Sequence, residues 1–392
     1  MKLRKFITSV LTPSILFAGC VMLSSSCSSR NESKGNTVEH FVVDASSFNE
    51  DAAERLNSLV SLTAIRLQMP DSLAIKASGT FIVNSDCRDR FILKYNYGFF
   101  IFNREGELLT YFNRKGQGPE EYNYASSVAM EGDTIYVLDT GKIQKYDING
   151  NYLGTISGVE TSRGQLAVNK SGMIYLQHAL NAENHLTVYS SDGSLIADMF
   201  PTKEVVRNFM IPSSQEMSLS TFESGVVYAP AFEQTIYILE DTTARQIATF
   251  DFGRHNISNS FFTGTTEEVE NEFHQRREHE QGFAYFDGIF VNEDWISCEP
   301  IGIPEDEARI VMADRRTGNT YTSSIFPQPL KMILGSRPYF AGYDTPSKSF
   351  AKVVSGDILE ETLENHPECI KKANFETFNS EDDDFIILIN FK

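Results

Sequence analysis

Four residues that can bind a divalent metal ion lie near the ends of predicted strands. They are Asp139, His178, Glu299 and Asp344. If those strands surround one channel, their carboxylate and imidazole groups could converge on an ion, as a metal-dependent hydrolase or lyase requires. The same residues could equally form salt bridges at the rim of the fold. The sequence leaves both interpretations open, and we expect the structural one.

A glycine-rich segment, KGQGPEEY at residues 115–122, is a second place where chemistry could occur. Gly116 and Gly118 can adopt backbone angles that are barred to other residues, and Pro119 fixes the direction of the chain. This pattern predicts a crossover from an outer strand to the next inner strand. In the alternative, four side chains lie at a channel mouth and contact a ligand: Arg114, Gln117, Glu120 and Tyr122.

Three clusters of metal-binding residue types have simpler interpretations. The segment 147–151, DINGN, begins like a calcium loop but lacks its later glutamate, so it predicts a hairpin. The acidic run at residues 381–384 predicts a solvated turn before a strand. His274 and His279 are five residues apart, which does not place both rings on one helix face. We therefore expect no cofactor, with calcium as the one that the sequence leaves open.

A repeated phrase of the sequence predicts the fold that positions these residues. A hydrophobic run, a charged hairpin with glycine at its tip and a second hydrophobic run recur about every 44 residues. Gly106, Gly150 and Gly193 are separated by 44 and 43 residues. That period suits one four-stranded blade of a β-propeller. The spacing therefore predicts an all-β fold of four-stranded antiparallel blades.

The strands that can be aligned predict six blades. Five repeats align on the second strands RFILKY, TIYVLD, MIYLQH, VVYAPA and WISCEP. A sixth blade would combine RPYFAGYD, SFAKVV and the terminal DDFIILINFK, closed by the early strand Leu62–Gln68. Small helical insertions are expected near 265–281 and 356–372. Five and seven blades are the alternatives.

The segment 115–122 also resembles the GxGPxEY signature of the bacterial six-bladed β-propeller lipoproteins, relatives of NHL and TolB-like propellers. The resemblance is clear between Phe81 and Gly158 and extends over most of the chain. It implies a lipid-anchored, exported propeller. It implies no established reaction, because the family is largely uncharacterised.

The N-terminus predicts export with a lipid anchor. Residues 1–27 read as a signal peptide whose positive start precedes a mainly apolar stretch too interrupted for a confident spanning helix. We favour lipidation at Cys27, which a polar tether follows at once, over Cys20; an ordinary cleaved signal is the other alternative. Residues 28–58 are expected to form the tether and an N-terminal segment, and residues 59–392 the propeller.

Charge restricts the partners of the mature protein. The chain has a net charge of −19, and removing residues 1–26 takes away three positive charges and no acidic residue, which gives −22. A strongly acidic protein repels nucleic acids and anionic headgroups, so we expect no nucleic-acid partner and membrane contact only through the lipid. Three further cysteines, Cys87, Cys298 and Cys369, are too few and too irregular for a disulfide framework.

Taken together, these features predict an exported binding or scaffold module. We expect a non-catalytic propeller, a monomer, that is anchored to the outer membrane and recognises a protein, peptide or glycan in the bacterial cell envelope, facing the periplasm or the cell surface. The alternative is a periplasmic hydrolase or lyase with a divalent metal in the channel.

Overall fold

The computed structural model describes residues 38–44, 50–77, 80–82, 89–159, 164–179, 182–207, 218–222, 225–278, 285–301, 310–323, 328–335, 342–344 and 346–392 of the chain. These residues belong to one compact unit, Val38–Lys392. Cys20, Cys27, Cys87 and His279 lie outside the described residues, as do all the residues of the predicted signal peptide.

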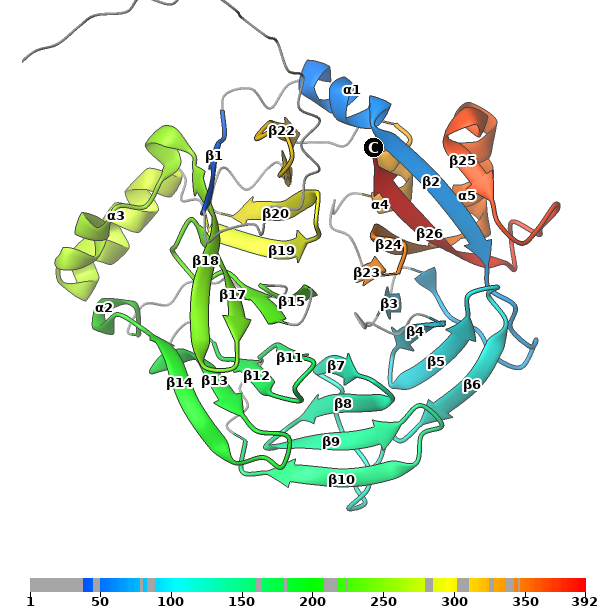
Figure 1. Ribbon diagram of the computed structural model, residues 1–392, viewed down its shortest axis with the longest axis horizontal. Helices are drawn as coiled ribbons and strands as arrows, with labels where there is room; N and C mark the ends of the chain where they lie inside the picture. The colour runs from blue at the N-terminus through cyan, green and yellow to red at the C-terminus, as the bar shows by residue number, and fades with distance from the viewer. Residues whose placement is uncertain are drawn as a thin grey trace, which may run out of the picture. The chain divides into compact units, whose positions relative to one another are not determined.

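Six mostly antiparallel sheets are arranged as blades around a common centre, which confirms the predicted six-bladed propeller (Figure 1). Blades 1 to 3 each use four consecutive strands. Blade 1 contains β3 (Thr80–Ile82), β4 (Arg90–Tyr95), β5 (Gly98–Asn103) and β6 (Leu108–Asn113). Blade 2 contains β7 (Ser127–Glu131), β8 (Thr134–Asp139), β9 (Lys142–Asp147) and β10 (Tyr152–Ser157). Blade 3 contains β11 (Leu166–Val168), β12 (Ile174–Gln177), β13 (Asn184–Tyr189) and β14 (Leu195–Pro201).

Blades 4 to 6 are less regular. Blade 4 contains β15 (Leu219–Phe222), β16 (Gly225–Tyr228), β17 (Thr235–Glu240) and β18 (Thr243–Asp251), with β1 (Glu39–Val42) as a fifth strand. Blade 5 contains β19 (Tyr285–Val291), β20 (Trp295–Ile301), β21 (Ile310–Asp314) and β22 (Thr320–Ser323). Blade 6 contains β23 (Gly342–Asp344), β24 (Ser349–Ser355), β26 (Asp384–Phe391), β2 (Val60–Arg66) and β25 (Ile370–Lys372). The ring therefore closes where the N-terminal β2 pairs with the C-terminal β26, as the sequence predicted.

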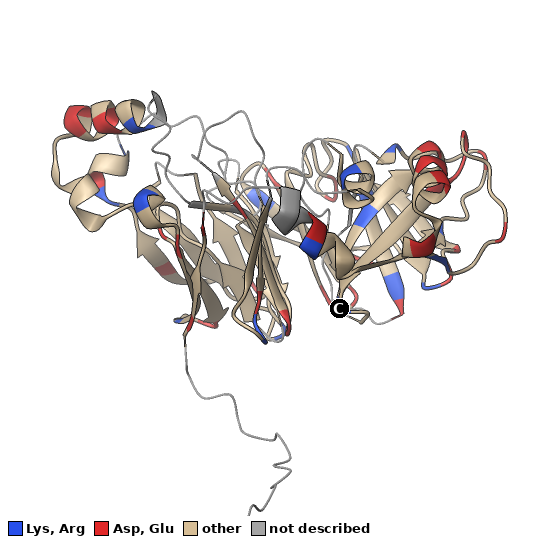
Figure 2. Ribbon diagram, turned by 90° about the horizontal axis from the view of Figure 1, so that it is seen from above, with Lys and Arg blue, Asp and Glu red and all other residues tan. Residues whose placement is uncertain are grey.

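Helices interrupt the strand pattern mainly in this second half. They are α1 (Glu50–Ser58), α2 (Glu204–Arg207), α3 (Thr266–Glu278), α4 (Leu330–Leu334) and α5 (Gly356–Asn365), with the 3₁₀ turns η2 (Gly253–His255), η3 (Asn259–Thr263) and η4 (Pro367–Cys369). The insertion expected at 356–372 is only partly helical, because Pro367 cannot continue α5 and the chain then extends into β25. None of the described helices is long and apolar enough to cross a membrane. In Figure 2 the charged residues gather on helices and loops, whereas the strands are mostly uncharged.

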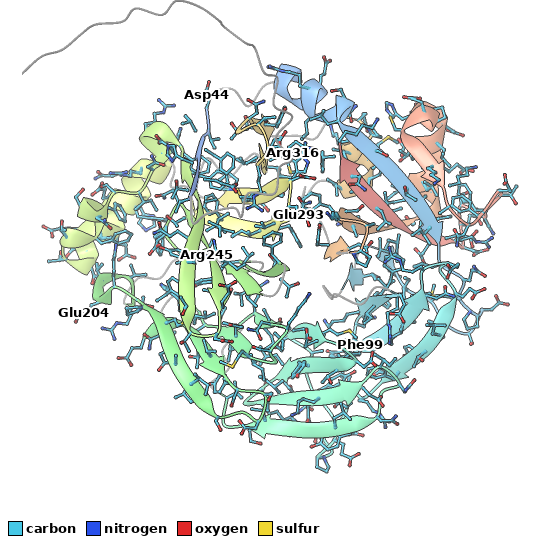
Figure 3. All side chains as sticks on the ribbon, viewed as in Figure 1. Asp44, Phe99, Glu204, Arg245, Glu293 and Arg316 are labelled. Atoms are coloured by element: carbon cyan, nitrogen blue, oxygen red, sulfur yellow. The ribbon has the colours of Figure 1, made fainter. Side chains whose placement is uncertain are left out.

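Side chains packed between neighbouring blades form the core. Six buried clusters fill the six junctions, and each draws residues from two adjacent sheets. Between blades 1 and 2, Phe99 stacks on Phe112 with ring centroids 5.1 Å apart, and Tyr146 of blade 2 lies 6.0 Å from Phe112 (Figure 3). Central strands buried on both faces explain why their sequences read as nearly continuous hydrophobic runs.

The repeated hairpin glycines mark contacts between blades. Gly106, Gly150 and Gly193 have φ of +77°, +77° and +92°, in the left-handed region that favours glycine. A Cβ at Gly150 would lie 2.5 Å from the Phe112 ring of blade 1, and one at Gly193 would lie 2.6 Å from Ile156 of blade 2. Each of these hairpin tips therefore packs against the preceding blade, so both φ and space exclude a side chain.

The sequence did not indicate the two added strands. Residues 39–40, assigned to the tether and N-terminal segment, lie within β1, which pairs in parallel with Ala248–Asp251. Arg315 in the turn after β21 holds this strand with two-pronged hydrogen bonds to Glu39 at 2.8–3.1 Å. The four residues of β1 and the three of β25 are too few to show an alternation that predicts a strand.

Candidate functional site

The glycine-rich segment at residues 115–122 connects blades 1 and 2 and forms hydrogen bonds with both. Glu121 folds back so that its Oε2 accepts a hydrogen bond from the Gly118 amide at 2.8 Å. A Cβ on Gly116 would lie 1.9 Å from that same oxygen, which is the movable end of the Glu121 side chain. Neither Gly116 nor Gly118 has a left-handed φ, so the expectation that the crossover uses angles barred to other residues at these glycines is wrong. The Tyr122 hydroxyl donates to the Tyr97 carbonyl, and burial raises the pKa of Tyr122 to about 12. Tyr122 is therefore a buried anchor and not a residue at an open channel mouth.

Side chains of blade 2 hold the other side of this segment by donating hydrogen bonds to the segment's backbone carbonyls. Lys142 Nζ and Gln144 Nε2 donate to the Glu121 carbonyl at 2.7 and 2.8 Å, and the Tyr146 hydroxyl donates to the Glu120 carbonyl at 2.8 Å. Both lysine and glutamine lie on β9, the third strand. These contacts support the predicted crossover.

The remaining polar residues of the segment face solvent. Arg114, Gln117 and Glu120 are exposed, and Arg114 Nε donates to the Gly150 carbonyl of the next hairpin at 3.1 Å. The arginine thus helps to fix the junction of the blades. A ligand contact at these three side chains stays a prediction.

The four metal-ligand candidates occupy different blades, and hydrogen bonds or ion pairs within the fold hold Asp139, Asp344 and His178. Both oxygens of buried Asp139 accept backbone amides, from Asn123 and Tyr124, at 3.0 Å. Asp344 is paired with both terminal nitrogens of Arg104 at 2.6 and 2.7 Å, across the junction of blades 6 and 1.

His178 belongs to a short hydrogen-bond chain in blade 3. Its Nε2 lies 2.7 Å from the Thr187 hydroxyl, which donates to Asp198 Oδ1 at 2.8 Å. Because the hydroxyl has one proton, His178 donates through Nε2. Glu299 lies half-buried within β20. Among the described residues, no three His, Cys, Asp or Glu side chains come close enough together to hold a metal ion.

The segments 147–151 and 381–384 are closed by their own hydrogen bonds. Asp147 Oδ1 accepts the amides of Asn149 and Asn151, each at 2.8 Å, and these bonds lower the pKa of Asp147 although burial opposes the shift. The run at residues 381–384 forms a turn in which the Asn379 amide donates to Asp383 Oδ2 at 2.7 Å. The two segments are therefore turns, as predicted, and the second also borders a cavity.

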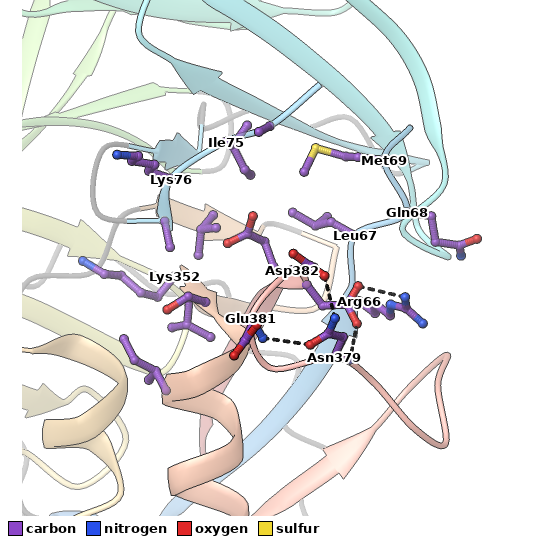
Figure 4. Close-up of a pocket in the computed structure, with 18 of the residues that line it drawn as sticks. Arg66, Leu67, Gln68, Met69, Ile75, Lys76, Lys352, Asn379, Glu381 and Asp382 are labelled. Carbon is purple, nitrogen blue, oxygen red and sulfur yellow. Dashed lines mark hydrogen bonds and ion pairs between the residues drawn. The ribbon is translucent and has the colours of Figure 1, made fainter. Parts of the chain in front are cut away.

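A large cavity opens beside blade 6, where the connection from β2 to β3 passes over it (Figure 4). Its volume is about 1370 Å³. Residues 66–77 form one wall, and α4, the end of β24 and α5 form another. Residues 374–384 complete the lining with Asn374, Asn379 and the acidic run.

Hydrogen bonds hold the first wall in place. Asn374 receives the Arg66 amide on Oδ1 at 2.8 Å and donates through Nδ2 to the carbonyls of Arg66 and Glu105, at 3.0 and 2.6 Å. Gln68 donates its amide to the Gly106 carbonyl at 2.7 Å. The wall is thus fixed between the β25–β26 connection and the first repeat hairpin.

The cavity brings acidic and basic groups together. Arg66 forms an ion pair of 2.8 Å with Asp383. Burial, helped by the charges of Asp383 and Asp357, raises the pKa of Asp384 to about 6. Burial lowers the pKa of Lys352, which lines another part of the cavity. Apart from the acidic run, no sequence pattern indicated this site, because its walls come from five segments that meet only when the ring closes.

Two solved structures are similar to this chain, and the first of them supports the architecture. A candidate exported protein from Bacteroides fragilis is similar, with 18% identity and a TM-score of 0.66 over 91% of this chain and 100% of that one. The WD40 domain of Pan2 from Neurospora crassa has 10% identity and a TM-score of 0.40 over 84% of this chain and 94% of that one.

Sequence comparison gives a family assignment. No curated protein matches the sequence. A family model described as "Domain of unknown function (DUF4934)" matches residues 78–390, which include most of the propeller. The chain therefore belongs to the family of the domain of unknown function DUF4934.

Proposed function

We propose that this protein is a binding module of the bacterial cell envelope and that the cavity beside blade 6 is its binding site. The cavity itself carries the proposal: about 1370 Å³, bordered by aliphatic, acidic and basic side chains on a hydrogen-bonded frame. Ligand sites in proteins are concave, with apolar walls and a few placed polar groups. The role is non-catalytic recognition of an envelope protein, peptide or glycan.

The same proposal includes export and a lipid at Cys27, with Cys20 as the second choice. It is supported by the N-terminal sequence, by the resemblance of residues 115–122 to the GxGPxEY signature of lipoprotein propellers, and by the description of the similar Bacteroides fragilis protein as a candidate exported protein. Metabolic labelling with an alkyne fatty acid tests it. Cys27→Ala should abolish the label and release the protein from the membrane fraction, whereas Cys20→Ala should not. Labelling that persists in Cys27→Ala but disappears in Cys20→Ala would instead assign the lipid to Cys20.

The cavity is tested by filling it. Ala74 is exposed and lines the cavity, so Ala74→Trp should occupy the space without disturbing the core. Leu153→Trp, on the exposed outer strand of blade 2, is the matched control. The mature protein, residues 28–392, is titrated by calorimetry with neutral oligosaccharides, acidic peptides and basic peptides.

We expect one ligand class to bind the wild type and Leu153→Trp equally and Ala74→Trp at least tenfold more weakly. Equal binding by all three proteins would place the site elsewhere.

A further inference from the structure

The size of the cavity favours an extended ligand. Pockets for drug-sized molecules have volumes of roughly 300–1,000 Å³, whereas this cavity measures about 1370 Å³. A small metabolite would leave much of the space filled with water. A short oligomer, such as a peptide of several residues or an oligosaccharide, fits the volume better.

The apolar part of the lining favours a peptide over a sugar. Its large apolar side chains are aliphatic or thioether groups, and they include Leu67, Met69, Ile75, Ile333, Val354 and Ile358. The described lining includes no aromatic side chain. Sugars are usually held by stacking on aromatic rings, while aliphatic surface suits aliphatic side chains equally well. The walls therefore match a peptide that carries residues such as leucine or valine.

The acidic edge of the cavity favours a cation. Residues 381–384 contribute four carboxylates, and one of them, Asp383, forms an ion pair with Arg66 of the lining. The raised pKa of Asp384 shows that negative charge and burial already act against its ionised form. An ammonium or guanidinium group placed there would relieve this repulsion.

Two lysines supply the opposite charge in the same cavity. Lys76 and Lys352 lie along one side of it, and Glu381 and Asp382 lie closer to its middle (Figure 4). Lys76 is exposed and Lys352 is half-buried, so a carboxylate that reached them would be partly withdrawn from water. Charge-assisted hydrogen bonds in such a place are stronger than those at an open surface.

Resting on the proposed binding function, we propose that the cavity binds a short peptide with a free carboxyl terminus. The peptide places its amino group or a basic side chain against Asp382 and Asp384, and its terminal carboxylate against Lys76 and Lys352. Aliphatic side chains between the two ends pack on the apolar lining around Met69.

The test uses the tetrapeptide Lys-Ala-Leu-Leu in three forms: free, amidated at the C-terminus, and acetylated with norleucine in place of lysine. Titration calorimetry measures their binding to the mature protein. We expect amidation to weaken binding about tenfold, as the loss of one charge-assisted contact does. The acetylated norleucine form should lose at least as much.

Two lysine variants identify the contact with the carboxylate. In Lys76→Met the free and amidated peptides should bind more nearly alike, because the group that distinguishes them has lost a partner. Lys352→Met should act in the same way. If this substitution of a half-buried lysine impairs folding, Lys76→Met, at an exposed position, still tests the contact. In Asp382→Asn, the free peptide and the acetylated norleucine form should bind with similar affinity, because the carboxylate that distinguishes them is gone. Lys145→Met, on β9 of blade 2, is the control and should change nothing.

The outcomes separate this inference from the proposed function. Peptide binding that is indifferent to both caps, or binding of oligosaccharides alone that Ala74→Trp abolishes, would overturn the inference and leave the cavity as a binding site. Ligand binding that Ala74→Trp does not affect would overturn both.

Discussion

Blades 1 to 3 and blades 4 to 6 are built from the same unit but differ in how strictly they follow it. The first three use consecutive strands, and the hairpins of all three carry a left-handed glycine. The last three contain two fifth strands, most of the helices, and a blade assembled from both ends of the chain. The cavity lies where this second half meets blade 1. The candidate site lies where the repetition is broken.

The largest effect is expected at the junction of the two halves. Arg104, in the blade 1 hairpin, pairs with Asp344 of blade 6, whose side chain is only 5% exposed. Arg104→Met would leave a buried carboxylate unpaired and should lower the free energy of unfolding by about 4 kcal/mol. Urea denaturation measures the loss. Asp344→Asn added to this variant should restore much of it; a loss below about 1 kcal/mol in the single variant would mean that the pair does not hold the junction.

Alanine substitutions at hairpin glycines compare the two halves of the propeller directly, through the stability that each one loses. Gly150 has φ +77° and the Phe112 ring beside it, so Gly150→Ala should cost about 3 kcal/mol, from left-handed strain and overpacking together. Gly318 of blade 5 also has φ +77°, but a Cβ added there would meet nothing within 4 Å among the described residues. Gly318→Ala should therefore cost only about 1 kcal/mol. Equal losses in urea denaturation would show that the contact between hairpin and preceding blade contributes nothing.

The smallest effect concerns the cavity at different pH values. The folded pKa of Asp384 is raised to about 6, so the native state binds its proton more tightly than the unfolded chain does. Its contribution to stability is present below about pH 4 and is lost as the pH rises through about 6. Asp384→Asn should therefore unfold at nearly the wild-type temperature at pH 4 and about 1–2 °C higher at pH 7. A difference in unfolding temperature between Asp384→Asn and the wild type that does not change with pH would contradict the raised pKa of Asp384.

Much of the fold could be predicted because its signals are local. The hairpin glycines and buried strands gave the blade period, and the sixth blade could be assembled from its last strands and the segment around Leu62. The helix α3 lies within the insertion expected near 265–281, and at its start the Glu268 carboxylate accepts the Thr265 amide at 2.8 Å.

The candidate site could not be predicted in the same way. Lys76 and Lys352 are separated by most of the chain, and neither stands in a motif. Their shared position follows from ring closure and from the turn at Pro70 to Leu73, neither of which has a sequence period. Residues that did stand in patterns, such as Asp139 and Tyr122, proved to satisfy backbone groups of the fold.

The pairing of β2 with β26 also determines when, during synthesis, the cavity can be completed. One wall of the cavity belongs to residues 66–77 and the opposite edge to residues 381–384, close to the last residue, Lys392. A ribosome makes residues 66–77 about 300 residues before residues 381–384, so a growing chain cannot enclose the cavity until the later segment has been synthesised.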